Sequence, residues 1–216
     1  MPDSPFRAVI WDFGGVISSS PFEAFAAYEQ AHGLPRDFLR TVNATNHMDN
    51  AWARFERSDI TLARFDAEFA AESAALGHAV PGRDVIGLLG GSIRPQMVQA
   101  LRVLRARLKI GLITNNVASP GAENADLKPD PVGRDAILPL FHHVIESAKI
   151  GLRKPDPKIY LLMTEALGVA PEHCVFLDDL GVNLKPARSL GMATIKVDDP
   201  DVALGELEAL VGFALR

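Results

Sequence analysis

Ala8-Val9-Ile10-Trp11-Asp12-Phe13-Gly14-Gly15-Val16 is an apolar run that ends in one carboxylate and two glycines. A short continuous apolar run is typical of a strand that is buried on both faces of a parallel sheet. Two later runs of this kind also end in polar side chains: residues 110–113 lead into Thr114–Asn116, and residues 174–177 lead into Asp178–Asp179. Because ligands bind beyond the carboxyl ends of parallel strands, we expect these polar side chains to meet at one edge of a sheet.

Beyond Gly90-Gly91 the chain alternates between strand and helix patterns. Strands are expected at residues 7–11, 109–113, 143–145, 174–177 and 193–197, and helices at residues 95–108, 134–140, 157–167, 183–190 and 202–210. This alternation predicts an α/β fold with a doubly wound parallel sheet. Residues 117–133 are rich in Pro, Gly, Asn and Asp and are expected to form a long loop.

The segment between the first strand and Gly90 has helical patterning and little sign of strand. It is rich in Ala, Phe, Glu and Arg, with breaks at residues 33–35, 58–59 and 77–82. We therefore predict a small helical bundle, here called the cap, inserted after the first strand. The expected domains are an α/β core of residues 1–17 and 91–216 and a cap of residues 18–90.

Composition excludes few classes of protein. The hydrophobic content of 48% over 216 residues is ordinary for a globular chain, and the net charge of −5 gives no reason to expect nucleic acid or an anionic membrane as partner. No apolar run approaches the roughly 20 residues of a membrane-spanning helix, and no secretory signal is evident, so a cytoplasmic protein is expected. The single cysteine, Cys174, lies in an apolar run and is expected to be a buried thiol. The oligomeric state is not indicated.

Each polar motif has an ordinary explanation when it is taken alone. Asp12 before two glycines is compatible with a tight turn, and Lys154 before a proline with a solvated loop. The pair Asp178 and Asp179 is a stronger signal, because adjacent carboxylates repel each other unless a cation, a donor or a helix N-terminus compensates them. The occurrence of all the motifs together, three of them at expected strand ends, predicts a site for metal-assisted attack on a phosphoryl group.

The order of these motifs resembles that of the haloacid dehalogenase superfamily. The resemblance is carried by residues 12–16, 113–115, 154–156 and 176–179. Within the superfamily, residues 151–160 and 176–188 are similar to the N-terminal phosphatase-like domains of soluble epoxide hydrolases and to relatives fused to acyl-CoA dehydrogenases. The resemblance covers nearly the whole chain and implies a doubly wound core with a helical cap inserted after the first strand.

The resemblance also implies a nucleophile and a metal site. Asp12 would be the nucleophile, which forms an aspartyl-phosphate intermediate. A Mg²⁺ ion would be held by Asp12, the main-chain carbonyl of Gly14 and Asp179, with Asp178 in direct or water-mediated contact. Such oxygen ligands suit this hard cation.

Three further residues are implied to bind or stabilise the phosphoryl group. Thr114 and the amide groups near Asn115 would hold the phosphoryl oxygens, and Lys154 would neutralise charge between nucleophile and phosphate. Asn183 lies about one helical turn beyond the aspartate pair. It is expected either to support the metal-holding carboxylates without touching the metal or to be a plain amide on a helix surface.

Gly14 departs from the pattern of the family. Phosphatases of the superfamily usually carry a second aspartate at this position as general acid and base, a function worth about 10²- to 10⁴-fold. Three outcomes stay open: another group, from the cap for example, transfers the proton; the substrate has an undemanding leaving group, as acyl and anomeric phosphates do; or the protein is weakly active and mainly binds. Glycine here could also occupy a backbone conformation that aspartate tolerates poorly.

The sequence therefore predicts a Mg²⁺-dependent phosphatase of small phosphorylated metabolites. One alternative is a non-catalytic or weakly active module that binds a phosphate ligand or a partner. Another is a haloacid dehalogenase, in which Asp12 displaces halide without a metal. Asp178 and Asp179 argue against dehalogenation, because a carboxylate that attacks without a cation gains nothing from a carboxylate pair beside it.

Four cap residues are candidates for facing the substrate: Asn46, His47, Trp52 and Arg54. An ordinary bundle with Trp52 in its core and His47 and Arg54 on its surface is the favoured interpretation. The histidine pair His142-His143 has no further suitably spaced His or Cys and is expected to be structural.

Overall fold

The computed structural model describes residues 4–117 and 133–216, and its centre is a five-stranded sheet in the order β3-β2-β1-β4-β5. All four neighbouring pairs of strands are parallel. The strands are β1 (Ala8–Trp11), β2 (Lys109–Thr114), β3 (His143–Glu146), β4 (Cys174–Asp178) and β5 (Ala193–Lys196). The expected α/β fold class with a parallel sheet is therefore confirmed, with strand bounds close to those predicted.

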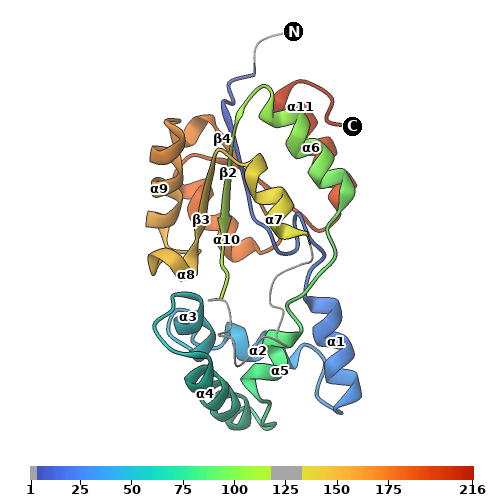
Figure 1. Ribbon diagram of the computed structural model, residues 1–216, viewed down its shortest axis with the longest axis vertical. Coiled ribbons are helices and arrows are strands. Elements are labelled where there is room, and N and C mark those ends of the chain that lie inside the picture. The colour runs from blue at the N-terminus through green and yellow to red at the C-terminus, as the bar shows by residue number, and fades with distance from the viewer. Residues whose placement is uncertain (1–3, 118–132) are drawn as a thin grey trace.

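Helices cover both faces of this sheet (Figure 1). The long helices of the core are α6 (Pro95–Arg105), α9 (Pro157–Leu167), α10 (Gly181–Ser189) and α11 (Pro200–Val211). Val9 and Trp11 pack on one face with residues of α6 and α11, whereas Ala8 and Ile10 pack on the other with residues of α9 and α10. Alternate residues of a strand point to opposite faces, so a strand covered on both sides has to be apolar throughout. The doubly wound arrangement is confirmed.

The register of the sheet sets the position of the polar strand ends. Trp11 is paired with Leu112 of β2 on one side and with Leu177 of β4 on the other. Asp12 therefore follows the central strand at the level where β2 and β4 also end. The three chain segments that carry the predicted site leave the sheet side by side.

Several connections are shorter or more irregular than predicted. Residues 134–140, expected to be one helix, form a single α-helical turn, α7 (Arg134–Ile137), followed by a 3₁₀ turn. Helix α8 (Ser147–Ile150) and a 3₁₀ turn at Pro171–His173 were not predicted, because so few residues leave no apolar period to detect. The loop predicted for residues 117–133 lies, apart from its two end residues, outside the described residues.

The chain between β1 and α6 is helical, as predicted. Its helices are α1 (Phe22–Ala31), α2 (Phe38–Ala44), α3 (Ala51–Glu56), α4 (Leu62–Ala75) and α5 (Gly82–Gly87). They lie together beyond one end of the sheet (Figure 1), around a separate apolar cluster that includes Phe25, Phe55, Phe65 and Phe69. Within residues 4–117 and 133–216, no helix combines the length and the apolar character needed to cross a bilayer.

Two chain segments connect the cap helices to the sheet. Ser18 and Ile93 form an isolated antiparallel bridge, and the amide of Ser19 donates to the carbonyl of Ser92 at 2.8 Å. The chain therefore leaves and re-enters the core at one place. On this basis we propose the division into a core of residues 1–17 and 91–216 and a cap of residues 18–90.

Candidate active site

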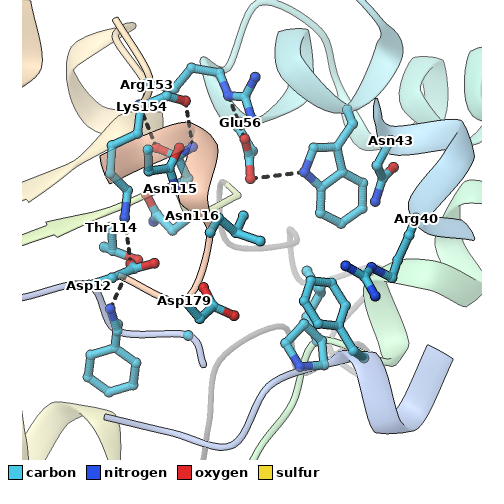
Figure 2. A pocket seen from close by; sticks show the side chains of 18 of the residues that line it. Asp12, Arg40, Asn43, Glu56, Thr114, Asn115, Asn116, Arg153, Lys154 and Asp179 are labelled. Carbon is cyan, nitrogen blue, oxygen red and sulfur yellow. Dashed lines mark hydrogen bonds and ion pairs between the residues drawn. The ribbon is translucent and has the colours of Figure 1, made fainter. Parts of the chain in front are cut away.

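A buried lysine joins two of the predicted carboxylates at the carboxyl end of the sheet. Figure 2 shows its contact with Asp12. Lys154 Nζ lies 2.8 Å from Oδ1 of Asp12 and 2.6 Å from Oδ2 of Asp178, and its side chain is fully buried. Burial disfavours the charge on this ammonium, but Asp12 and Asp178 outweigh burial and raise the pKa of Lys154 above its usual value. Lys154 is therefore a fixed positive charge against Asp12.

The carboxylates of the site hold more negative charge than this lysine compensates. Burial, followed by the neighbouring Asp178 and Asp179, raises the pKa of Asp12 well above its usual value, although Lys154 opposes the shift. Burial and the nearby Asp178 raise the pKa of Asp179 to about 7. A cation bound between Asp12 and Asp179 would stabilise the ionised form of both carboxylates.

Asp12, Asp178 and Asp179 can present such a cation with three ligands. One carboxylate oxygen of each lies within 4.8 Å of the others, and this is the one group of His, Cys, Asp and Glu in the described part of the chain with such spacing. A set of oxygens alone suits Mg²⁺. The donor set fits the ion that the motifs predict.

Asn183 is buried beside Asp178, and the alternative of a helix-surface amide is wrong. Its Nδ2 donates to Oδ1 of Asp178 at 3.0 Å and to Oδ2 at 3.1 Å. The amide of Leu180 also donates to Oδ1 at 2.8 Å. With Lys154 on Oδ2, Asp178 is held by several donors, which leaves Asp12 and Asp179 as the carboxylates more open to a ligand.

The two glycines after Asp12 have different structural roles. Gly14 lines the cavity beside Asp12, its φ is outside the left-handed region, and a Cβ built there would have no atom within 4 Å. Gly15 has a φ of 75°, and a Cβ there would lie 2.1 Å from Oδ2 of Asp179. The strain expected at Gly14 is therefore found at Gly15, where a side chain would displace Asp179.

Thr114 and Asn115 lie at the end of β2 but differ in what they can offer a ligand. Thr114 is buried and lines the cavity. The side chain of Asn115 is engaged with the backbone of Lys154: its Oδ1 accepts from the amide at 2.8 Å, and its Nδ2 donates to the carbonyl at 2.9 Å. Asn115 therefore ties the end of β2 to the loop that presents the lysine.

A cavity of about 710 Å³ separates these groups from the cap helices. Across it from Asp12 and Asp179 lie Arg40 and Asn43 of α2 (Figure 2). Further lining residues that the sequence analysis did not identify are Phe22, Phe25, Glu56, Asn116, Arg134 and Arg153. Arg153 could have been found as the neighbour of Lys154. Asn116 follows Thr114 and Asn115 and could have been found from the same strand end, whereas Phe22, Phe25, Glu56 and Arg134 lie on helices that share no sequence motif.

The four cap candidates are divided by the structure. His47 and Trp52 line the cavity, whereas Asn46 and Arg54 do not. Trp52 also contacts the rings of Phe65 and Phe69, so it belongs to the cap core as well as to the cavity wall. Arg54 Nη2 lies 2.5 Å from Oε2 of Glu68. Neither the interpretation as a substrate-facing cluster nor the interpretation as an ordinary bundle is right for all four residues.

Two further expectations concerned residues outside the site. His142 Nδ1 accepts a hydrogen bond from the amide of Ile110 at 3.0 Å, near the start of β2, so its structural role is confirmed. Cys174 is buried, and burial raises the pKa of its thiol to about 12. Both observations agree with the buried core thiol that the sequence predicts.

Comparisons of the sequence identify relatives over nearly its whole length. A family model described as haloacid dehalogenase-like hydrolase matches residues 6–191. The chain is 36% identical over 221 residues to acyl-CoA dehydrogenase family member 10 of Mus musculus, and this match covers 98% of the chain and 20% of the relative. It is 34% identical over 226 residues to bifunctional epoxide hydrolase 2 of Sus scrofa, and this match covers 97% of the chain and 39% of the relative. The chain thus spans less than half the length of either relative.

The fold is similar to that of a haloacid dehalogenase (HAD) family enzyme from Bacteroides thetaiotaomicron, whose crystal structure is a complex with magnesium and inorganic phosphate. The TM-score is 0.56 at 20% sequence identity, and the match covers 88% of this chain and 93% of that one. At this identity the likeness concerns the fold.

Proposed function

The chain belongs to the haloacid dehalogenase-like hydrolases, and on that premise we propose that it is a Mg²⁺-dependent phosphatase of small phosphorylated metabolites that works through an aspartyl-phosphate on Asp12. The observation that carries the proposal is the buried cluster of Asp12, Lys154, Asp178 and Asp179 at the carboxyl end of the sheet. It combines a nucleophile, a fixed positive charge and a set of oxygen ligands for a divalent cation.

The proposed metal ligands are Asp12, Asp179 and the main-chain carbonyl of Gly14, with Asp178 in direct or water-mediated contact. When bound, the cation supplies charge compensation for the carboxylates and for the phosphate oxygens. Asn183 holds Asp178 in place by donating to both of its oxygens. Asp178 in turn orients Lys154.

In the first step an Asp12 oxygen attacks phosphorus, and the bond from phosphorus to the leaving oxygen breaks. Lys154 and the hydroxyl of Thr114 stabilise the negative charge on the transferring phosphoryl group. Backbone amides near Asn115 complete this binding site. A water molecule then attacks the phosphorus of the aspartyl-phosphate, which releases inorganic phosphate and regenerates the Asp12 carboxylate.

Gly14 limits which leaving groups this site serves well. The position beside the nucleophile has no carboxylic acid to protonate a leaving alkoxide. Acyl, anomeric and aryl phosphates leave more readily than simple alkyl phosphates, so we propose that substrates with such leaving groups are preferred.

A screen of phosphorylated small molecules tests the proposal, with and without Mg²⁺ and with Asp12→Asn as control. We expect hydrolysis that needs Mg²⁺ and is abolished in Asp12→Asn. Activity that persists in Asp12→Asn would contradict the mechanism.

The lack of a carboxylic acid at Gly14 also favours a second candidate, a protein that binds a phosphate ligand or a partner and turns over weakly. Calorimetry that shows tight binding of Mg²⁺ and a phosphate analogue, without turnover of any substrate, would support it. Dehalogenation by Asp12 is less favoured because of Asp178 and Asp179. Chloride release from 2-chloropropionate in the presence of a chelator would support dehalogenation. A cytoplasmic location remains part of the proposal.

A further inference from the structure

Glu56 is a buried carboxylate in the cavity wall that the proposed mechanism does not use. It is the last residue of α3 and is 6% exposed. Its Oε1 accepts a hydrogen bond from the indole Nε1 of Trp52 at 2.9 Å, and its Oε2 lies 2.6 Å from Nε of Arg153 (Figure 2). One carboxylate therefore holds a cap aromatic ring on one side and a core guanidinium on the other.

Arg153 connects the cap to the loop that presents the catalytic lysine. It directly precedes Lys154, and its Nη1 donates to the carbonyl of His47 at 2.7 Å. Its ion pair with Glu56 is a second contact with the cap, and both side chains are largely buried. The position of the cap in this region is thus tied to the chain segment that carries the ammonium beside Asp12.

Trp52 depends on Glu56 for its hydrogen bond. The indole is half-buried, lies against Phe65 at a centroid distance of 5.8 Å, and forms part of the cavity wall. A buried indole N–H normally requires an acceptor, and Glu56 provides it. The carboxylate therefore orients a ring that faces the cavity.

We propose that Glu56 is a positioning residue for substrate selection. Through Trp52 and Arg153 it sets the distance and angle between the cap wall and Lys154, and hence the size of leaving group that the cavity accepts. The claim that Glu56 influences substrate selection rests on the proposed phosphatase function. The claim that Glu56 orients Trp52 and Arg153 does not. A buried ion pair adds little stability by itself, which is consistent with a positioning role.

A second ion pair in the cap offers a matched control. Arg54, also on α3, lies 2.5 Å from Glu68 of α4, and Glu68 also lies 2.7 Å from Arg64. Neither Arg54 nor Glu68 lines the cavity. Glu68→Gln therefore removes a cap carboxylate from an ion pair without changing the cavity wall.

The kinetic test compares Glu56→Gln with Glu68→Gln on two substrates, a bulky aryl phosphate and acetyl phosphate. We expect Glu56→Gln to raise the KM of the aryl phosphate about tenfold more than that of acetyl phosphate, because loss of a charged contact is worth at least about that factor. Glu68→Gln should show no such difference. Equal effects of Glu56→Gln on both substrates, or the same discrimination in Glu68→Gln, would overturn the proposal.

A spectroscopic test needs no activity. The chain has two tryptophans, so a Trp11→Phe background leaves Trp52 as the one tryptophan, whose emission is excited selectively over that of the tyrosines. Trp11 Nε1 is buried without a hydrogen-bond partner in the described structure, so its loss removes no hydrogen bond. In this background Glu56→Leu, which removes the acceptor of the indole N–H as well as the charge, should increase acrylamide quenching of Trp52 by about twofold or more, since the ring becomes locally free, and Glu68→Leu should not.

Unchanged quenching in Glu56→Leu would overturn the proposal even if the chain proves to be a phosphatase. Conversely, absence of any turnover would defeat the proposed function and leave the quenching test decisive. If Glu56→Gln does not fold, Trp52→Phe keeps the ion pair and removes only the indole. It should show the same discrimination between the two substrates, and the lack of it would count against the inference.

Discussion

The backbone at Gly15 adopts a φ of 75°, which favours glycine, and Asp179 fills the space where a side chain would lie. We expect Gly15→Ala to lower the free energy of unfolding by more than about 1 kcal/mol and to weaken Mg²⁺ binding, because the Asp179 carboxylate has to move. Chemical denaturation and metal titration measure the two effects.

Gly14→Ala is the matched control for this prediction. The new methyl group meets no atom within 4 Å and the backbone is not left-handed. The free energy of unfolding should be unchanged or higher by up to about 1 kcal/mol, since alanine lowers the conformational entropy of the unfolded chain. A loss as large as that of Gly15→Ala would contradict this account of the two glycines.

Gly14→Asp tests the missing general acid directly. The open space at Gly14 accepts a carboxylate without backbone strain. If protonation of the leaving group limits the rate, turnover of alkyl phosphates should rise by about 10²-fold or more, and that of acyl or aryl phosphates by less. An equal effect on all substrates, in a variant with unchanged stability, would show that proton transfer does not limit the rate.

At the scale of elements, the end of β3 is joined to α7 and α8 through one carboxylate. Arg134 Nη2 lies 2.6 Å from Oε1 of Glu146, and Lys149 contacts Oε2. Burial by itself would raise the pKa of Glu146, but hydrogen bonds and ion pairs with Lys149 and Arg134 outweigh burial and hold the pKa below its usual value. These contacts fix the chain segments that flank Asn116 in the cavity wall.

The lowered pKa of Glu146 gives a stability that depends on pH. A carboxyl group with a lower pKa in the folded state stabilises the fold above its unfolded pKa, and this stability is lost as pH falls through the folded pKa. Glu146→Gln should therefore lower the free energy of unfolding at pH 7 by about 1–3 kcal/mol, and the difference from the parent protein should shrink below the ordinary pKa of 4.5. Denaturation curves of both proteins from pH 7 to pH 3 measure this difference in the free energy of unfolding. A difference that grows in acid would contradict the sign.

At the scale of the molecule, the site stores repulsion among the three aspartates that a cation can relieve. Mg²⁺ at one hundred times its dissociation constant should raise the free energy of unfolding by about 2.7 kcal/mol, because it binds only the folded chain. A chelator should reverse the increase. In Asp179→Asn the metal-free protein should be no less stable than the parent, and its gain from Mg²⁺ should be smaller. An equal gain in that variant would remove Asp179 from the ligand set.

The sheet and the cap together explain which parts of the site could be predicted. The proposed catalytic cluster comes from segments that end neighbouring strands, and buried strands are recognisable from short apolar runs. Asp12, Thr114 and the aspartate pair were therefore placed correctly at the carboxyl end of the sheet, and Lys154 contacts Asp12 and Asp178 in the structure. The cap side of the cavity had no comparable signal, because its lining residues lie on separate helices whose packing sets which faces meet.

The amino-acid sequence alone specifies the parallel sheet, the helical insert and the chemical groups at the strand ends, because apolar periodicity and chain order are local properties. Tertiary structure alone decides that Asn183 donates to Asp178, that Asn115 hydrogen-bonds to the backbone of Lys154, and that Glu56 contacts both Trp52 and Arg153. Each of these depends on side-chain directions at the contact between elements far apart in the chain. Such directions follow from how the helices pack and not from the residue pattern of any one of them.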